Sequence, residues 1–210
     1  MPRVWMCVAC IVLLLLQAVP AARTAVCLID PCQSSGSSAG GVLLVCPAGD
    51  GPTLSSIGAM LSVTLEDCSG APVQGIPAQD FWIQGKADPQ LLCGGYLSSS
   101  ADAASNLSGQ TTISGSIAAG GYFGDGVYAI ALGYMIQGTD GLCDNPLPLV
   151  LVSPDINGDL VVGLADLAIF ATAFPSGGGT VDPRMDFNGD GQIGPADLSL
   201  FAGHFLHRCE

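Results

Sequence analysis

The sequence predicts a mainly β protein, a β-sandwich followed by a small all-α module. Three observations support this fold class. Short apolar runs alternate with turn residues as far as residue 153, and the chain has 29 glycines but only 11% charged residues. That composition fits a turn-rich β protein better than a helical one. From residue 154 the pattern changes to two aligned copies of a segment with helical periodicity.

The first 22 residues have the pattern of a secretory signal peptide. Arg3 precedes an apolar run at 4–16, and small residues suited to cleavage follow. The run is too short for a good membrane span, and nothing later in the chain approaches membrane-spanning length. We therefore expect a soluble mature protein that is secreted or lies at the cell surface, with domains at 23–153 and 154–210.

The cysteines predict disulfide bonds. Removing Cys7 and Cys10 with the signal peptide leaves seven of the nine: Cys27, Cys32, Cys46, Cys68, Cys93, Cys143 and Cys209. In an exported chain these are expected to form disulfides rather than metal thiolates, and no C-x-x-C pair remains to indicate zinc. Because seven is odd, one thiol stays free or pairs between molecules. The spacing leaves the connectivity open.

The formal net charge of −13 excludes some classes of partner. Only Lys86, Arg184 and Arg208 are basic in the clearly mature part of the chain. Such a surface repels nucleic acid and anionic lipid, and it attracts cations.

The expected strands follow one another at short intervals. In "MLSVTLED" Leu61, Val63 and Leu65 alternate with polar residues, which is the period of a half-buried strand. The apolar run "VYAIALGYMI" predicts one long strand. The expected strands are 42–46, 60–67, 81–85, 111–117, 127–136 and 147–153. Turn residues between them and the absence of a helical period favour a sandwich.

Part of this region resembles known modules. The phrases "VTLEDCSGAPVQGIP", "ADAASNLSGQTTISGSI" and "GVYAIAL" are similar to bacterial Ig-like and transthyretin-like sandwich modules over roughly residues 60–136. The resemblance implies an Ig-like fold and says little about activity.

The C-terminal region is an internal repeat. Residues 155–174 and 186–205 align without a gap at an offset of 31. Each copy opens with alternating Asp and Asn and continues with apolar residues at i, i+3, i+4 and i+7, one face of a helix. The aligned face residues are Leu167, Phe170, Ala171 and Phe174 with Leu198, Phe201, Ala202 and Phe205.

The acidic start of each copy has the spacing of a calcium loop. Such a loop needs oxygen ligands at positions 1, 3 and 5, a backbone carbonyl at 7 and a carboxylate at 12, with glycine at 6 for the turn. The ten predicted ligands are Asp155, Asn157, Asp159, Val161 (carbonyl) and Asp166, then Asp186, Asn188, Asp190, Gln192 (carbonyl) and Asp197. The alternative is that these residues only cap turns and helix starts.

Leu160 occupies position 6 of the first loop, where the second loop has Gly191. If that position is left-handed, a non-glycine residue costs about 1–2 kcal/mol. We therefore expect the first calcium site to be weaker by about one order of magnitude.

A duplicated loop–helix unit without an entering helix resembles a dockerin over residues 154–206. The resemblance implies two Ca²⁺ ions, two antiparallel helices and a cohesin module as partner. Positions 10 and 11 help to choose that partner, and here they are Leu164, Ala165, Pro195 and Ala196, which are apolar where dockerins usually have polar residues. The exit helices lack Lys and Arg, and no linker precedes Asp155. Packing of the repeat on the sandwich as a cap therefore remains an alternative to docking.

Catalytic chemistry is not indicated. The only histidines, His204 and His207, end the last helix, where cations are favourable, and the sandwich has no histidine to act as a base. The sequence predicts a secreted, non-catalytic calcium-binding protein that acts in extracellular or cell-surface assembly.

Two rival functions remain. The first is a carbohydrate-binding accessory of a polysaccharide-degrading complex, using Trp82, Tyr96, Tyr122, Phe123, Tyr128 and Tyr134. The second is a small glycoside hydrolase with a carboxylate pair drawn from Glu66, Asp67, Asp80, Asp88, Asp102, Asp125, Asp140 and Asp144.

Overall fold

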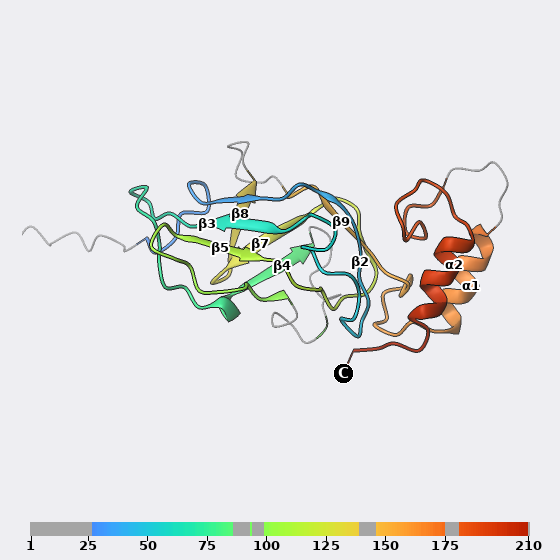
Figure 1. Cartoon of the computed structure of the whole chain (residues 1–210). Coiled ribbons are helices and arrows are strands. Elements are labelled where there is room, and N and C mark those ends of the chain that lie inside the picture. Colours follow the sequence, from blue (N-terminus) through green and yellow to red (C-terminus); the bar gives the residue numbers. More distant parts are fainter. Residues whose placement is uncertain (1–26, 86–92, 94–98, 139–145, 175–180, 210) are drawn as a thin grey trace, which may run out of the picture.

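A computed structural model describes residues 27–85, 93, 99–138, 146–174 and 181–209 of the chain. The expected signal peptide lies outside these residues, as do Lys86, Tyr96 and Cys143. The protein is mainly β, with two α-helices at the C-terminal end of the described chain (Figure 1). No helix among the described residues is long and apolar enough to span a membrane.

The larger sheet has six strands in the order β4-β7-β8-β1-β3-β5. Its neighbours pair antiparallel except for β1 and β8, which are parallel. A 3-10 helix at Ala78–Asp80 leads into β4. The strands are β1 (Ser35–Ser37), β3 (Leu61–Thr64), β4 (Phe81–Gly85), β5 (Gln110–Ile113), β7 (Val127–Ala131) and β8 (Tyr134–Gly138).

The smaller sheet has three strands in the order β2-β9-β6. These are β2 (Gly41–Leu44), β9 (Leu149–Val152) and β6 (Tyr122–Phe123). β2 and β9 are parallel, whereas β6 and β9 are antiparallel.

The prediction of one long strand at 127–136 is wrong, because the chain reverses there in the β7–β8 hairpin. The turn residues Leu132 and Gly133 have φ values of 49° and 85°. Two consecutive positive φ angles are typical of a type I′ turn, whose twist suits a hairpin. The usual sequence signal is Asn-Gly or Asp-Gly, so an apolar Leu132 concealed the turn. The other five expected strands each overlap an observed strand, which is generally shorter.

The two sheets share one hydrophobic core. The larger sheet contributes Leu61, Val63, Phe81 and Ile83, among others, and the smaller sheet contributes Leu43, Phe123, Leu149 and Leu151. Alternate residues of β3 and β4 are buried, as the period-two pattern predicts.

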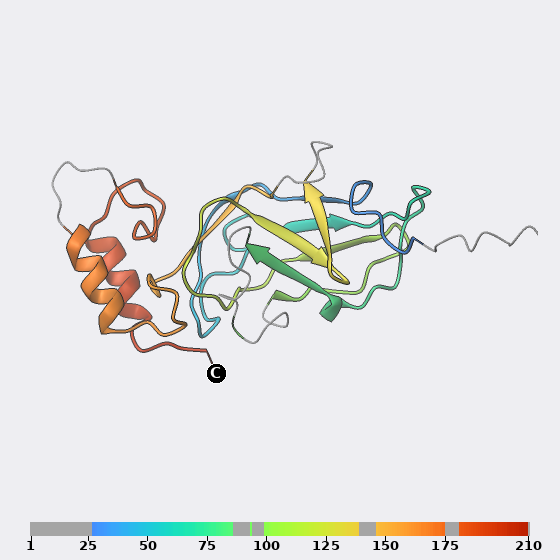
Figure 2. The same ribbon diagram turned by 180° about the vertical axis from the view of Figure 1, so that it is seen from behind.

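The smaller sheet also packs against the helices through its other face. Leu44, Val152 and Tyr122 alternate with the residues that face the shared core, and they belong to a second core with Phe170, Phe187 and Phe201. The smaller sheet is therefore covered on both sides, and the second core spans the expected domain boundary at residues 153 and 154. Figures 1 and 2 show the helices at the end of the molecule next to β2 and β9.

The two helices, α1 (Leu164–Ala173) and α2 (Pro195–Gly203), lie side by side (Figures 1 and 2). The buried rings of Phe170 and Phe201 meet between them at a centroid distance of 5.9 Å. The predicted apolar face is only partly correct, because Ala171, Leu198 and Ala202 are exposed. Ile169, Ala173 and Leu200 pack against the core instead.

The prediction of disulfide bonds is confirmed for the described cysteines. Cys27 pairs with Cys68 and Cys93 with Cys209, and Cys32 is disulfide-bonded as well. Cys46 is the free, buried thiol among the described residues. The Cys93–Cys209 bond joins the end of the chain to the β-sheet body.

Candidate metal centre

The first acidic loop follows β9 directly and is attached to the β-sheet body. Ser153, Asp155 and Asp166 are buried. The Ser153 hydroxyl donates to the Ala119 carbonyl at 3.4 Å, and the Gly121 amide donates to the Asp155 carbonyl at 2.8 Å. The position of Asp155 is therefore set by the β-sheet body as well as by its own loop.

Backbone amides surround the Asp155 carboxylate. The amides of Gly158 and Asp159 donate to Oδ1 at 3.0 and 3.1 Å, and the amide of Leu160 donates to Oδ2 at 2.8 Å. Asn157 Nδ2 donates to Asp159 Oδ2 at 2.9 Å. These bonds wrap the loop around the carboxylate, the curvature that a cation loop requires.

The second loop repeats this pattern. The amides of Asp190 and Gly191 donate to Asp186 at 3.0 and 2.8 Å, and Asn188 Nδ2 donates to Asp190 Oδ2 at 2.9 Å. The amides of the seventh-position residues, Val161 and Gln192, donate to the fifth-position carboxylates in both copies. The sequence repeat is thus also a repeat of hydrogen bonds.

The closing residues Asp166 and Asp197 act as helix caps. Oδ2 of each accepts the amide of the N-cap glycine, Gly163 or Gly194, at 2.8 Å. Oδ1 of Asp166 accepts the Asn157 amide at 3.0 Å, and Oδ1 of Asp197 accepts the Phe187 amide at 2.8 Å. Capping leaves lone pairs available on each carboxylate, so it is compatible with binding a cation.

Three carboxylates converge in the first loop. One oxygen from each of Asp155, Asp159 and Asp166 lies within 4.8 Å of the others. Among the described residues, the equivalent acids of the second loop form no such group, and Asp186 is less buried than Asp155. The first loop is therefore the more closed of the two.

The pKa of Asp155 is raised to about 6. Burial is the largest cause, the negative charges of Asp166 and Asp159 also raise the pKa, and the amides of Leu160 and Asp159 lower it. A buried carboxylate beside two others is unfavourable unless a positive charge is close. The donors are carboxylate, amide and carbonyl oxygens, the ligands that calcium prefers. The residues present therefore fit a calcium ion.

Leu160 is left-handed, as position 6 requires. Its φ is 67°, and the equivalent Gly191 has a φ of 80°. The side chain lies over the β-sheet body, because a Cβ placed on Gly120 would come within 3.1 Å of Leu160 Cδ2. Leucine thus gives a packing contact at a position where the backbone favours glycine.

Replacing Leu160 with glycine should tighten calcium binding at the first loop by about tenfold, because it removes about 1–2 kcal/mol of backbone strain. Leu160→Ala is the matched control, since it loses the same packing contact but keeps a Cβ. Calorimetric titration in an Asp190→Ala background measures the first loop by itself. Equal calcium affinities for the two variants would contradict the strain argument.

The predicted partner-binding residues are all exposed. Leu164 and Ala165 begin α1, and Pro195 and Ala196 begin α2. Leu164 is 73% exposed, which is high for a large apolar side chain.

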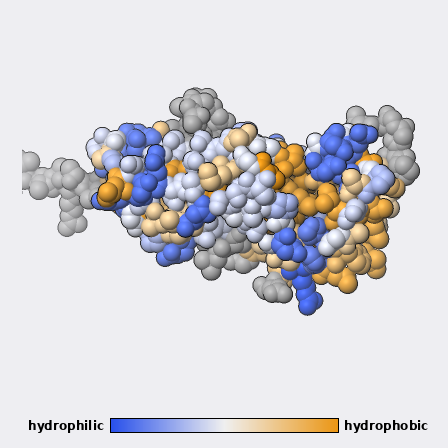
Figure 3. Space-filling view, viewed as in Figure 1, coloured by the Kyte–Doolittle hydropathy of each residue, from blue (hydrophilic) through white to orange (hydrophobic). Residues whose placement is uncertain are grey.

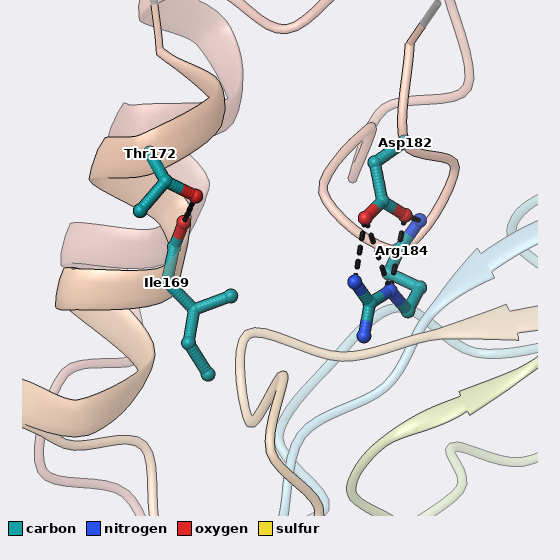
Figure 4. A network of polar contacts seen from close by, with 4 residues as sticks. All are labelled: Ile169, Thr172, Asp182 and Arg184. Atoms are coloured by element: carbon teal, nitrogen blue, oxygen red, sulfur yellow. Dashed lines mark hydrogen bonds and ion pairs between the residues drawn. The ribbon is translucent and has the colours of Figure 1, made fainter.

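Two local contacts lie on either side of residues 175–180. Arg184 forms a bidentate ion pair with Asp182, with an Nη2–Oδ2 distance of 2.6 Å (Figure 4). In the last turn of α1, the Thr172 hydroxyl donates to the Ile169 carbonyl at 2.7 Å.

A second group of metal-type ligands was not predicted. Cys46, Asp50, His204 and His207 bring a thiol, a carboxylate and two imidazoles within 4.8 Å of one another. The sequence pattern places the histidines only at the end of a helix. The i, i+3 spacing of the two histidines was the one local signal; Cys46 and Asp50 lie far away in the sequence.

No known protein-family model matches the chain, and no curated protein matches it at a significant level.

Proposed function

We propose that this is a secreted, non-catalytic, calcium-binding protein that acts in extracellular or cell-surface assembly through a dockerin-like C-terminal repeat. One observation carries the proposal. Two loops of identical spacing share most of their hydrogen bonds, and they have left-handed residues at the same positions and a closing aspartate at the start of a helix. Capping of turns and helix starts explains the hydrogen bonds of these carboxylates, but it does not offset the negative charges of Asp155, Asp159 and Asp166, which lie close together.

In this proposal each loop binds one Ca²⁺ ion. The ligands are those at positions 1, 3, 5, 7 and 12 of each loop. Calcium supplies the positive charge that offsets the repulsion among Asp155, Asp159 and Asp166.

The proposed module is an integral part of the protein rather than a tethered tag. The second core contains Leu44 and Val152 of the smaller sheet together with Phe170 and Phe201 of the helices. We further propose that the two sheets around their shared core form an Ig-like sandwich. Calcium then orders a helical face whose orientation on this body is constant.

The proposed binding residues form two apolar patches, Leu164 and Ala165 at the start of α1 and Pro195 and Ala196 at the start of α2. The patches lie at opposite ends of the helix pair, because the end of α2 is hydrogen-bonded to the segment just before α1. Apolar surface gathers over the helices in the view of Figure 3. Apolar residues at these positions favour a cohesin-like partner with an apolar contact surface.

The rival functions have less support. Trp82 aligns across the strands with Ile130, whereas Tyr134 aligns with Ala131 and Phe81, so the two aromatic side chains lie on opposite faces of the sheet. Phe123 and Tyr128 are buried. These residues therefore do not form one stacking platform.

For the glycoside hydrolase, two of the candidate carboxylates are Asp67 and Asp102. Both accept hydrogen bonds from nearby serine and threonine residues in exposed turns.

Calcium titration of the chelated mature protein tests the proposal. We expect two binding events by calorimetry and a gain of helical circular dichroism as calcium is added, because the loops position the first turn of each helix. Failure to bind calcium at millimolar concentration would show that the loops are only helix caps.

Matched variants assign the two events. Asp159→Ala and Asp190→Ala change equivalent, exposed residues at position 5, so each should remove one binding event without disturbing the core. Asp125→Ala changes an exposed aspartate outside both loops and should leave two events. Loss of both events in a single variant would contradict the assignment of one ion to each loop.

A further inference from the structure

The C-terminal end of the chain meets the β-sheet body at a cluster of four side chains. Cys46 follows β2 and is fully buried, and Asp50 follows in the next turn. His204 is the C-cap of α2, and His207 comes three residues later. The side chains of His204, His207 and Asp50 are 14%, 30% and 50% exposed, so the cluster is closed on the inside and open at Asp50.

The polar atoms of the cluster point to one place. His207 Nδ1 lies 3.3 Å from Cys46 Sγ, 3.4 Å from His204 Nδ1 and 3.3 Å from Asp50 Oδ2. The other Asp50 oxygen, Oδ1, lies 3.5 Å from His204 Nδ1.

Hydrogen bonds alone do not satisfy this arrangement. A ring nitrogen has either one proton to donate or one lone pair to accept with, so His207 Nδ1 can serve one partner at a time. Here it faces three partners, and two of those, His204 and Asp50, also face each other. A cation at the common point would bind all four side chains at once.

The separations match a tetrahedral zinc site. With Zn–N distances of about 2.0–2.1 Å and a Zn–S distance of about 2.3 Å, tetrahedral angles place two nitrogens about 3.4 Å apart and a nitrogen and a sulfur about 3.6 Å apart. Thiolate and imidazole ligands favour zinc over calcium, which takes oxygen ligands. Four protein ligands are typical of a structural rather than a catalytic zinc site.

A cysteine nucleophile fits the geometry less well. In a Cys–His–Asp site the imidazole uses one nitrogen for the thiol and the other for the carboxylate. Here Cys46 Sγ and Asp50 Oδ2 both approach Nδ1 of His207. The Cys46 residue is also fully buried, so a substrate could not reach its sulfur.

We propose that Cys46, Asp50, His204 and His207 bind one zinc ion, which fastens the C-terminal module to the β-sheet body. Zinc binds the Cys46 thiolate, and the thiol proton is released to solvent without any change of oxidation state. The site is separate from the calcium loops, so the proposal does not depend on the proposed function. Its position next to the Cys93–Cys209 bond gives the chain end two attachments to the body.

The test uses the mature chain with its disulfides intact, stripped of metal by chelation and then saturated with calcium. Calorimetry should show one zinc ion per chain. Cobalt in its place should give the thiolate-to-metal charge-transfer absorption of a tetrahedral site. Cys46→Ala should abolish that absorption, and His207→Gln should weaken zinc binding at least ~100-fold, because each removes one of four ligands.

Two control variants separate this site from the acidic loops. Asp190→Ala should lose a calcium event and retain zinc binding, and Asp125→Asn should retain both. If Cys46→Ala does not fold, Asp50→Asn tests the zinc site in its place, because the Asp50 side chain is half exposed and the substitution is conservative. Asp50→Asn should weaken zinc binding about tenfold. Zinc binding that is absent at ~10 μM, or unchanged in Asp50→Asn and His207→Gln, would overturn the proposal whatever the calcium result.

Discussion

Replacing Phe170 with alanine should lower the free energy of unfolding by about 3–5 kcal/mol, the usual cost of deleting a buried aromatic ring. Phe170 is 1% exposed, and its ring centroid lies 5.8 Å from those of Phe174 and Phe187 and 5.9 Å from that of Phe201. The lost ring therefore leaves a cavity at the centre of the second core. Urea denaturation followed by circular dichroism measures the change.

Leu164→Ala is the matched control for Phe170→Ala. It removes an apolar side chain from the same helix at an exposed position, so its effect should stay within about 0.5 kcal/mol. Because the second core includes Leu44 and Val152, the fluorescence of Trp82 in the β-sheet body should change at the same urea concentration as the helical signal. A loss below about 1 kcal/mol for Phe170→Ala would contradict the close packing of Phe170 in the second core.

Phe170 also illustrates which parts of the fold are readable from the sequence. The repeat aligns it with Phe201, and helical periodicity places both on an apolar face, which is a local pattern. The exposed Ala171 and Ala202 show that the pattern does not settle the direction of that face. The direction depends on what covers the helices, and that is the smaller sheet.

The packing of the smaller sheet was also hard to predict, because it too depends on which elements cover the strands. The continuous apolar run "LPLVLVS" predicts a strand, and such runs are typical of strands covered on both faces. The sequence does not indicate which elements cover them. In the structure Leu149 and Leu151 face the shared core while Val152 faces the helices, and these contacts join segments far apart in the chain.

The acidic loops and the cluster at Cys46 differ in the same way. Each acidic loop keeps its predicted ligands within twelve consecutive residues, so spacing alone predicts a candidate cation site there. The cluster at Cys46 joins residues 161 positions apart, Cys46 and His207. They meet because the chain end pairs with the first loop itself, where the Leu206 amide donates to the Val162 carbonyl. That pairing has no local sequence signal.

Removing the Cys93–Cys209 disulfide by serine substitution at both residues should lower the free energy of unfolding by about 5 kcal/mol in the chain-entropy model. The bond spans 116 residues, so it restricts the unfolded chain strongly. It also fixes the chain end locally, because the Cys93 amide donates to the Ala118 carbonyl and the Cys209 amide to the Leu160 carbonyl. Urea denaturation gives the global change.

The Cys27–Cys68 disulfide provides the control, because it spans 41 residues and lies entirely outside the 93–209 loop. Its removal should cost about 4 kcal/mol in the same model. The decisive difference is local. Without Cys93–Cys209, hydrogen exchange at the amides of Val162 and Leu206 should accelerate well beyond the global unfolding rate, because the chain end can then separate from residues 160–162. Without Cys27–Cys68, the amides of Val162 and Leu206 should exchange only at the rate set by global unfolding. Equal protection in the two variants would mean that the pairing of the chain end, and not the disulfide, holds the C-terminus in place.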